Sequence, residues 1–172
     1  MLQLSGSLLN RPVLSLRTGG VVATTTGAII NPNNLKIEGF YCIDSFDRKK
    51  TLVLVYQDIR DFIPQGFVVN DHDILAEPQE LVRLKDMMDL HFELLGKPVA
   101  TTGKDKLGKV VDYATDTTTM YVQKIYVSQS ILKNLTGGNL GIDRMQIIEI
   151  TDRKIIVQDL AQRVPAGAKA WA

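Results

Sequence analysis

Four lysines lie close together in the second half of the chain, and their ammonium groups are the best candidates for binding a charged partner. They are Lys97, Lys104, Lys106 and Lys109. Such a cluster could meet an acidic protein, RNA or an anionic lipid surface. Sites for single-stranded RNA also use interleaved aromatic rings, and Tyr113 is the only ring nearby. The alternative is a solvated basic turn. We take Lys104, Lys106 and Lys109 as the candidate partner-binding residues.

Charge is divided unevenly between the halves of the 172-residue chain. Residues 94–172 hold 11 Lys and Arg against 7 Asp and Glu, a balance of +4, and the remainder sums to −3, which gives the total of +1. A total this close to zero is not typical of a general polyanion binder. Any charge-driven contact is therefore expected to be local and to involve the second half.

Groups that could catalyse a reaction are sparse. His72 lies between Asp71 and Asp73 and could ligate a metal or act as a base, but no second histidine or cysteine stands at ligand spacing. A solvated loop is the simpler interpretation. Cys42, the single cysteine, follows an aromatic pair and is predicted to be a buried structural thiol. Because catalysis needs converging groups, we expect no enzyme activity, no catalytic residue, no metal and no cofactor.

The two halves of the chain repeat one pattern. Four segments return in the same order 85 to 88 residues later: Leu8–Val13 as Leu94–Val99, Leu35–Ile37 as Met120–Val122, Ile59–Phe62 as Ile147–Ile150, and Phe67–Val69 as Ile155–Val157. A chance similarity would not keep both order and spacing over four segments. Only two copies with a long period indicate tandem domains rather than a solenoid.

Each copy has the pattern of short strands separated by turns. Val21–Thr26 is rich in β-branched residues, which favour strands, and Asn31–Asn34 has the composition of a turn. Thr51–Val55 is an apolar run of the length of a buried strand. Many short strands at close spacing favour a small barrel, which leaves no open sheet edge.

One segment between the copies has helical spacing instead. Pro78–Met88 begins with a proline and acidic residues, and Leu81, Leu84 and Met88 fall on one helical face. We expect a helix of about three turns that packs on the barrels, with a solvated linker as the alternative.

These observations define the predicted architecture. The chain is expected to be mainly β, with two tandem small β-barrels joined by a short α-helix. The predicted divisions are a first, divergent barrel at 1–77, a linker helix at 78–91, a second barrel at 92–163 and a tail at 164–172. The tail carries Trp171, the only tryptophan, which could dock on its own barrel or on a partner. We take it as a further candidate for partner binding, with a frayed terminus as the alternative.

The second copy resembles the PRC-barrel family, which is named for the H subunit of the photosynthetic reaction centre. Members open with the strand pattern (L/I)-x-G-K-x-V, followed after a turn by G-K-V-x-D. Leu94–Val99 and Gly108–Asp112 are similar to these two patterns, and the stretch from Gln146 to Val157 looks like the family's late strands. The first copy is more divergent, with Asn10 and Arg11 where the family has Gly and Lys.

The resemblance implies a binding module rather than a reaction. The family includes the reaction centre subunit and a ribosome-maturation factor that contacts a ribosomal protein. The expected function is therefore a non-catalytic protein-binding adaptor or scaffold with an unknown protein partner. The alternatives are a ribosome-associated or RNA-processing factor, which would bind a ribosomal protein or RNA, and a protein of the membrane periphery. A homodimer is also open.

The sequence also gives an expectation about location. No run of about 18 apolar residues is present, so no membrane span is predicted. The first residues lack the charged and apolar regions of a secretory signal. We therefore expect a cytoplasmic protein, with peripheral membrane contact still possible.

Overall fold

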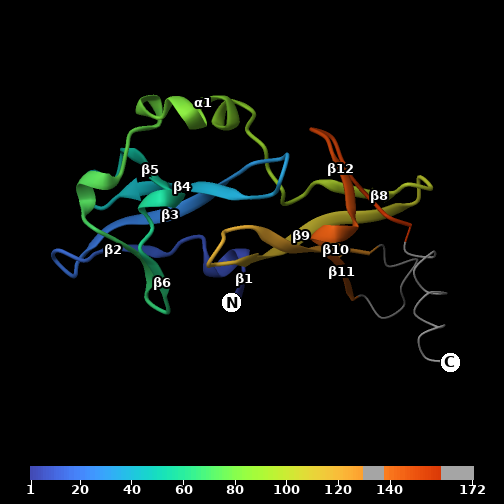
Figure 1. Ribbon diagram of the computed structural model, residues 1–172, viewed down its shortest axis with the longest axis horizontal. Coiled ribbons are helices and arrows are strands. Elements are labelled where there is room, and N and C mark those ends of the chain that lie inside the picture. The colour runs from blue at the N-terminus through green and yellow to red at the C-terminus, as the bar shows by residue number, and fades with distance from the viewer. Residues whose placement is uncertain (130–137, 160–172) are drawn as a thin grey trace. The chain divides into compact units, whose positions relative to one another are not determined.

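The computed structural model describes residues 1–129 and 138–159 and shows a mainly β protein, which confirms the predicted class (Figure 1). The chain forms two compact units. Unit 1 contains Met1–Phe92 and Ala114–Val122, and unit 2 contains Glu93–Tyr113 and the described residues from Gln123 onward. The segment Ala114–Val122, which the sequence placed in the second domain, thus belongs to unit 1.

The first sheet has six strands in the order β5-β4-β3-β2-β7-β6. Their bounds are β2 Pro12–Ser15, β3 Val21–Ile30, β4 Ile37–Asp44, β5 Thr51–Val55, β6 Asp61–Ile63 and β7 Gly66–Val69. All neighbours pair antiparallel except β2 and β7, which pair parallel. One side of this sheet holds the core of unit 1, where the rings of Phe40 and Phe67 lie 4.8 Å apart and are both fully buried.

The second sheet repeats this order as β11-β10-β9-β8-β13-β12. Its strands are β8 Pro98–Thr101, β9 Lys106–Asp116, β10 Val122–Ser128, β11 Asn139–Asp143, β12 Ile147–Ile150 and β13 Ile155–Val157. The short β1, Leu2–Leu4, pairs with the far end of β9. The parallel pair recurs as β8 and β13.

The two sheets match residue by residue. Pro12 pairs with Thr24, and Pro98 pairs with Lys109. The following residues, Val13 and Val99, pair in the same regular way with Ala23 and Gly108. A β-bulge then follows in each sheet, between Val13 and Leu14 in the first and between Val99 and Ala100 in the second. The duplication that the sequence indicates is thus present as a repeated topology with a repeated irregularity.

The hydrogen bonds between the described strands do not close either sheet into a barrel. Among the described residues, no pairing joins the two end strands of either path, β5 to β6 or β11 to β12, so each sheet is open. Two closed barrels were expected because the sequence predicts many short strands at close spacing. Strand spacing alone does not fix the shear that closure requires.

The connection between the repeats is less regular than expected. Pro78–Glu80 forms a 3-10 turn, η4, and the helix α1 spans only Val82–Asp89. Leu81 separates them because its backbone leaves the helical region, with ψ at 80°. The helix buries Leu84 and contacts β3 of unit 1. The predicted helix is therefore present but begins four residues later than Pro78.

Short 3-10 turns complete the connections. They are η1 Ser5–Ser7, η2 Tyr56–Asp58, η3 His72–Ile74 and η5 Arg144–Gln146. Of these, η2 and η5 follow the equivalent strands β5 and β11, so the repeat extends into the connections.

Two equivalent hairpin turns pair with each other inside unit 1. Leu35 ends the turn between β3 and β4, and Met120 ends the turn between β9 and β10; both have left-handed backbones, with φ of 57° and 60°. The N–H of Ile37 donates to the carbonyl of Met120, and the N–H of Val122 donates to the carbonyl of Leu35, at 2.7 and 2.9 Å. The side chains of Leu35 and Met120 are both almost fully buried. The two turns therefore contribute these side chains to the core of unit 1.

We expect Met120→Ala to lower the free energy of unfolding by about 2–4 kcal/mol, because it removes a buried side chain and leaves a cavity. Urea titration followed by circular dichroism measures this. Met145→Ala, at a side chain that is 86% exposed, is the matched control and should change stability by less than about 0.5 kcal/mol. Equal effects of the two substitutions would contradict the packing described for the hairpin turn.

Candidate functional site

The outer face of unit 2 carries a groove of about 840 Å³ over strands β9, β8, β13 and β12. Lys104, Lys106 and Lys109, the three lysines singled out from the sequence, all line it, and Lys154 joins them. Each of the four side chains is exposed. Among residues 1–129 and 138–159 no ion pair involves any of the three predicted lysines.

The floor of the groove is a row of side chains across four strands. Glu149 pairs with Ile156, Ile156 pairs with Ala100, and Ala100 pairs with Lys106. Paired residues point to the same side of a sheet. The neighbours of Ala100 and Ile156 along their strands are buried, whereas these two are only half-buried, so the row faces away from the core. The row is therefore apolar in the middle and charged at both ends.

A backbone irregularity brings the lysines to one face. In a regular strand, residues three apart point to opposite sides of the sheet. At the bulge between Val99 and Ala100, Leu107 of β9 has no pairing partner on β8. Pro98 therefore pairs with Lys109, and Ala100, two residues later, pairs with Lys106. Bulges commonly re-aim side chains in this way. Lys106 and Lys109 consequently both line the groove.

Lys104 is held in an unfavourable backbone conformation. Its φ is 67°, in the left-handed region, which costs a residue other than glycine about 1 kcal/mol. Its N–H donates to the carbonyl of Thr101, and the equivalent bond in unit 1 runs from Gly19 to Ser15. Gly19 has the same backbone conformation, with φ of 73°. The first copy thus places glycine where the second places a lysine.

The same comparison shows what is special about the groove. In unit 1 the row equivalent to Glu149, Ile156, Ala100 and Lys106 consists of Asp61, Val68, Leu14 and Val21. Thr24 stands where Lys109 stands. The same sheet therefore forms without the lysines and with a larger residue in place of Ala100. Neither feature is required by the fold.

Lys97, the fourth lysine of the cluster, does not line this groove. The ammonium group of Lys97 donates to the carbonyl of Asp152 at 2.9 Å. Trp171 lies outside the described residues. Sequence reasoning missed Lys154, Ala100 and Ile148, which is 54% exposed in the lining. The alignment of Leu14 with Ala100 in the repeat was the signal that could have identified the hollow.

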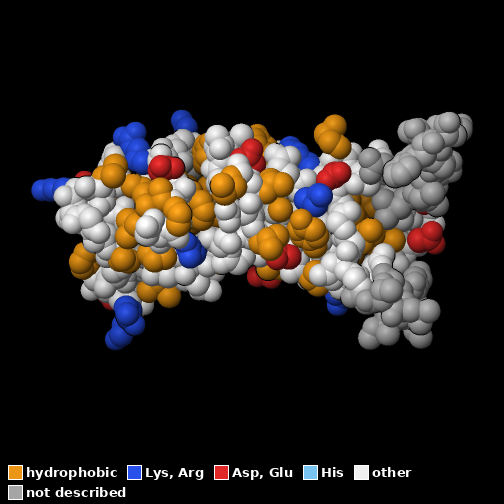
Figure 2. All heavy atoms as spheres, turned by 90° about the horizontal axis from the view of Figure 1, so that it is seen from below, with side chains coloured by type: hydrophobic (Ala, Val, Ile, Leu, Met, Phe, Trp, Pro, Cys, Tyr) orange, Lys and Arg blue, Asp and Glu red, His pale blue; other side chains and the backbone are white. Residues whose placement is uncertain are grey.

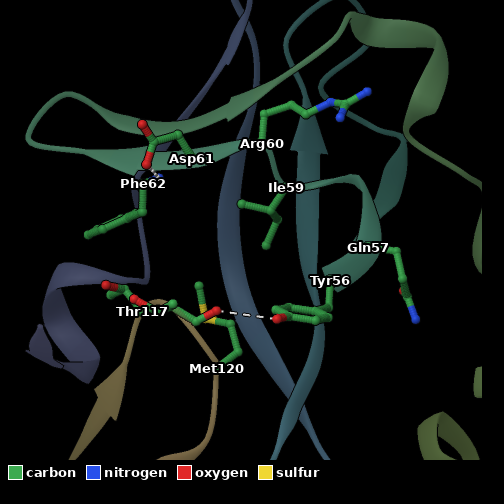
Figure 3. A pocket seen from close by; sticks show the side chains of 9 residues that line it. Tyr56, Gln57, Ile59, Arg60, Asp61, Phe62, Thr117 and Met120 are labelled. Atoms are coloured by element: carbon green, nitrogen blue, oxygen red, sulfur yellow. Dashed lines mark hydrogen bonds between the residues drawn. The ribbon is translucent and has the colours of Figure 1, made fainter.

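A second, smaller hollow of about 350 Å³ lies in unit 1 beside η2 and β6 (Figure 3). The hydroxyl of Tyr56 donates to the carbonyl of Thr118 at 3.3 Å. Figure 3 shows Ile59 directed toward Met120, whereas the guanidinium of Arg60 points away, where it donates to the side chain of Asn70. Tyr56 and Arg60 are thus engaged with their own chain, through partners in different directions.

The surface of unit 1 differs in character from the lysine groove. Leu16 and Val21 are 63% and 47% exposed at the β2–β3 turn and the start of β3. Figure 2 shows hydrophobic side chains gathered on one face of unit 1, with few charged side chains among them. At the positions of Lys106 and Lys109 unit 1 has Val21 and Thr24, so these two basic residues belong to the second copy.

His72 has a partner, and the loop that carries it is ordered by carboxylates. Its Nε2 lies 3.0 Å from Oδ1 of the buried Asp44. Burial alone would raise the pKa of Asp44, but hydrogen bonds from the N–H of Phe46 and from His72, with the charges of His72 and Lys50, bring that pKa below its ordinary value of 3.8. Asp71 accepts hydrogen bonds from Ser15 and from Arg17. The contact between His72 and Asp44 thus holds the loop after β7 against β4.

The remaining reactive groups are buried. Burial raises the pKa of the Cys42 thiol to about 12, and that of the Tyr113 hydroxyl to about 12 as well. The thiol is therefore protonated at neutral pH, as the interpretation of a structural cysteine requires. Tyr113, the ring considered for RNA stacking, is only 2% exposed.

Two further searches bear on the site. Within residues 1–129 and 138–159, no three His, Cys, Asp or Glu side chains gather where they could hold a metal ion. Within the same ranges, no helix combines the length and the apolar content of a membrane crossing.

Comparison with models of protein families finds no match for this chain, and a search of curated proteins finds no similar sequence either.

We expect Lys104→Gly to raise the free energy of unfolding by about 0.5–1 kcal/mol, since glycine adopts the left-handed conformation without steric cost. Thermal and urea unfolding measure the change. Lys106→Gly, in a strand with an ordinary backbone, is the matched control and should destabilise by a similar amount. A loss of stability in Lys104→Gly would contradict the strain assigned to this turn.

Stability should also fall in acid through Asp44. Because its pKa is lower in the folded state than in the unfolded chain, the ionised carboxylate stabilises the fold above its ordinary pKa, and this contribution is lost as pH falls through the folded-state value. We expect Asp44→Asn to cost about 1–2 kcal/mol at pH 7 and to flatten the decline of stability below about pH 4.

Urea titrations at several pH values test this, with Asp73→Asn, at an exposed residue in the same loop, as the control. A decline in acid that is as steep in Asp44→Asn as in the natural protein would show that the Asp44–His72 pair does not carry it.

Proposed function

We propose that this chain is a non-catalytic protein-binding adaptor and that the groove of unit 2 is its contact surface. The observation that carries the proposal is the gathering of Lys104, Lys106, Lys109 and Lys154 around an apolar floor. Exposed ammonium groups that form no ion pair with the described part of the chain favour an acidic surface. An apolar centre with a polar rim is the usual anatomy of a protein contact.

We further propose that the two repeats are PRC-barrel modules. The resemblance depends on short motifs, and two glycines of those motifs occupy positions that favour glycine. Gly96 has φ of 83°, and Gly108 has φ of 142° with no room for a Cβ beside the carbonyl of Ser128. Gly96 donates to the carbonyl of Val110 just as Asn10 donates to that of Thr25 in the first copy. These features support the family proposal for the second copy and extend it to the first.

A role in binding RNA or ribosomal particles is the second candidate, and the lysines favour it too. Tyr113, the ring nearest to the lysines in the sequence, is buried and cannot stack on a base, and stacking platforms supply much of the affinity for single strands. We therefore place protein binding first. A cytoplasmic location remains part of the proposal.

The proposal is tested by replacing the lysines with the residues of the first copy, Lys104→Gly, Lys106→Val and Lys109→Thr. These residues already occupy the same fold in unit 1, so folding should be retained. We expect the natural chain to retain one protein at stoichiometric levels from an extract of its own cells, and the triple variant to retain at least about tenfold less, with retention falling as salt rises.

The matched control removes three exposed positive charges from unit 1, through Arg48→Thr, Lys49→Val and Lys85→Thr. It has the same net charge as the triple variant and should retain the partner fully. Equal retention by both triple variants, or no stoichiometric protein at all, would contradict the proposed function. Retention that ribonuclease abolishes would favour the RNA candidate instead.

A further inference from the structure

We infer that the groove of unit 2 accepts a short acidic segment of a partner protein, with one large apolar side chain seated over Ala100. The inference rests on the proposed function, since it specifies the chemistry of the partner at the same surface. It goes further by separating an apolar anchor from the charged contacts, so that each can be removed without the other.

The anchor position follows from the small side chain of Ala100. Ala100 and Ile156 are adjacent on the outer face and only half-buried, and the lining continues to the exposed Ile148. In unit 1 the position of Ala100 is filled by Leu14. The second copy thus leaves a space that a leucine-sized side chain occupies in the first. Burial of an apolar side chain there is worth more than a contact on a flat surface.

The charges determine which side of the anchor is acidic. Lys106 is next to Ala100 on one side, and Glu149 lies two strands away on the other, beyond Ile156. Neighbouring strands are about 4.8 Å apart, so the lysine side of the groove begins one strand away from the anchor, and carboxylates of the segment are favoured on that side. On the opposite side the lining has one lysine, Lys154 just before β13, and Glu149 on β12 offsets its charge.

This arrangement favours a peptide over other anionic partners. A nucleic acid strand carries negative charge at every phosphate and would bring some of it toward Glu149. An anionic bilayer presents a flat surface of headgroups, with no single side chain to fill the space over Ala100. A peptide alone combines one anchor with charges on one side only.

The test uses a display library of random linear peptides selected against the whole chain. We expect enriched peptides to carry one Leu, Ile, Met or Phe with two or more Asp or Glu on one side of it. The best peptides are then synthesised with a fluorescent label and titrated by anisotropy against variants of the whole chain.

Ala100→Leu, the residue of the first copy, should weaken these peptides at least tenfold while leaving the unfolding transition in place. Ala100→Val is a smaller substitution that keeps the test decisive if the leucine variant unfolds, and it should weaken binding by an intermediate factor. Leu14→Ala, in the equivalent row of unit 1, is the matched control and should leave affinity unchanged.

Enriched peptides that are neutral or basic would overturn the inference, and so would acidic peptides that bind Ala100→Leu as tightly as the natural chain. Binding of phosphatidylserine vesicles or of oligo(U) that needs the lysines but not the space over Ala100 would also overturn it. Failure of the proposed function has a different signature, because no protein would then depend on the lysines in cell extract. If a protein from the extract binds through the lysines and its binding is unaffected by Ala100→Leu, only the apolar anchor over Ala100 is ruled out.

Discussion

Parallel pairing of β2 with β7 and of β8 with β13 is the constraint on which both sheets depend. Val13 pairs with Phe67 and Val99 with Ile155, over separations of 54 and 56 residues. Closing such long loops carries an entropic cost that local hairpins avoid, and the buried apolar residues of these strands offset it. The groove depends on the same pair, because only the contact of β8 with β13 brings Ile156 beside Ala100.

Duplication separates what the fold needs from what one copy adds. Both repeats keep the strand order, the bulge and the left-handed hairpin residues Leu35 and Met120. They differ on the outer face, where one has Leu14 and Val21 and the other Ala100 and Lys106. A strained lysine at position 104, where its counterpart is a relaxed glycine, has a cost in stability. Strain of this kind is commonly retained at functional positions.

The sequence was informative wherever composition and order carried the signal. It predicted the mainly β class, the repeat and the three lysines that line the groove. It could not show that Lys106 and Lys109 share a face, because a period of two places them on opposite sides and the bulge has no reliable sequence signature. It also extended the helix back to Pro78, since proline and acidic residues favour a helix start and nothing marked the break at Leu81. Barrel closure depends on shear between distant strands, which local patterns do not encode.

The membership of Ala114–Val122 in unit 1 has a consequence for how the protein can be divided. The chain passes from one unit to the other at three places, after Phe92, after Tyr113 and after Val122. A fragment that began at Glu93 would contain Met120 but lack the turn at Leu35 that pairs with it. A fragment that ended at Phe92 would contain Leu35 but lack the turn at Met120. Gene fusion, truncation or recombination at the repeat boundary would therefore split the core of unit 1 between two pieces.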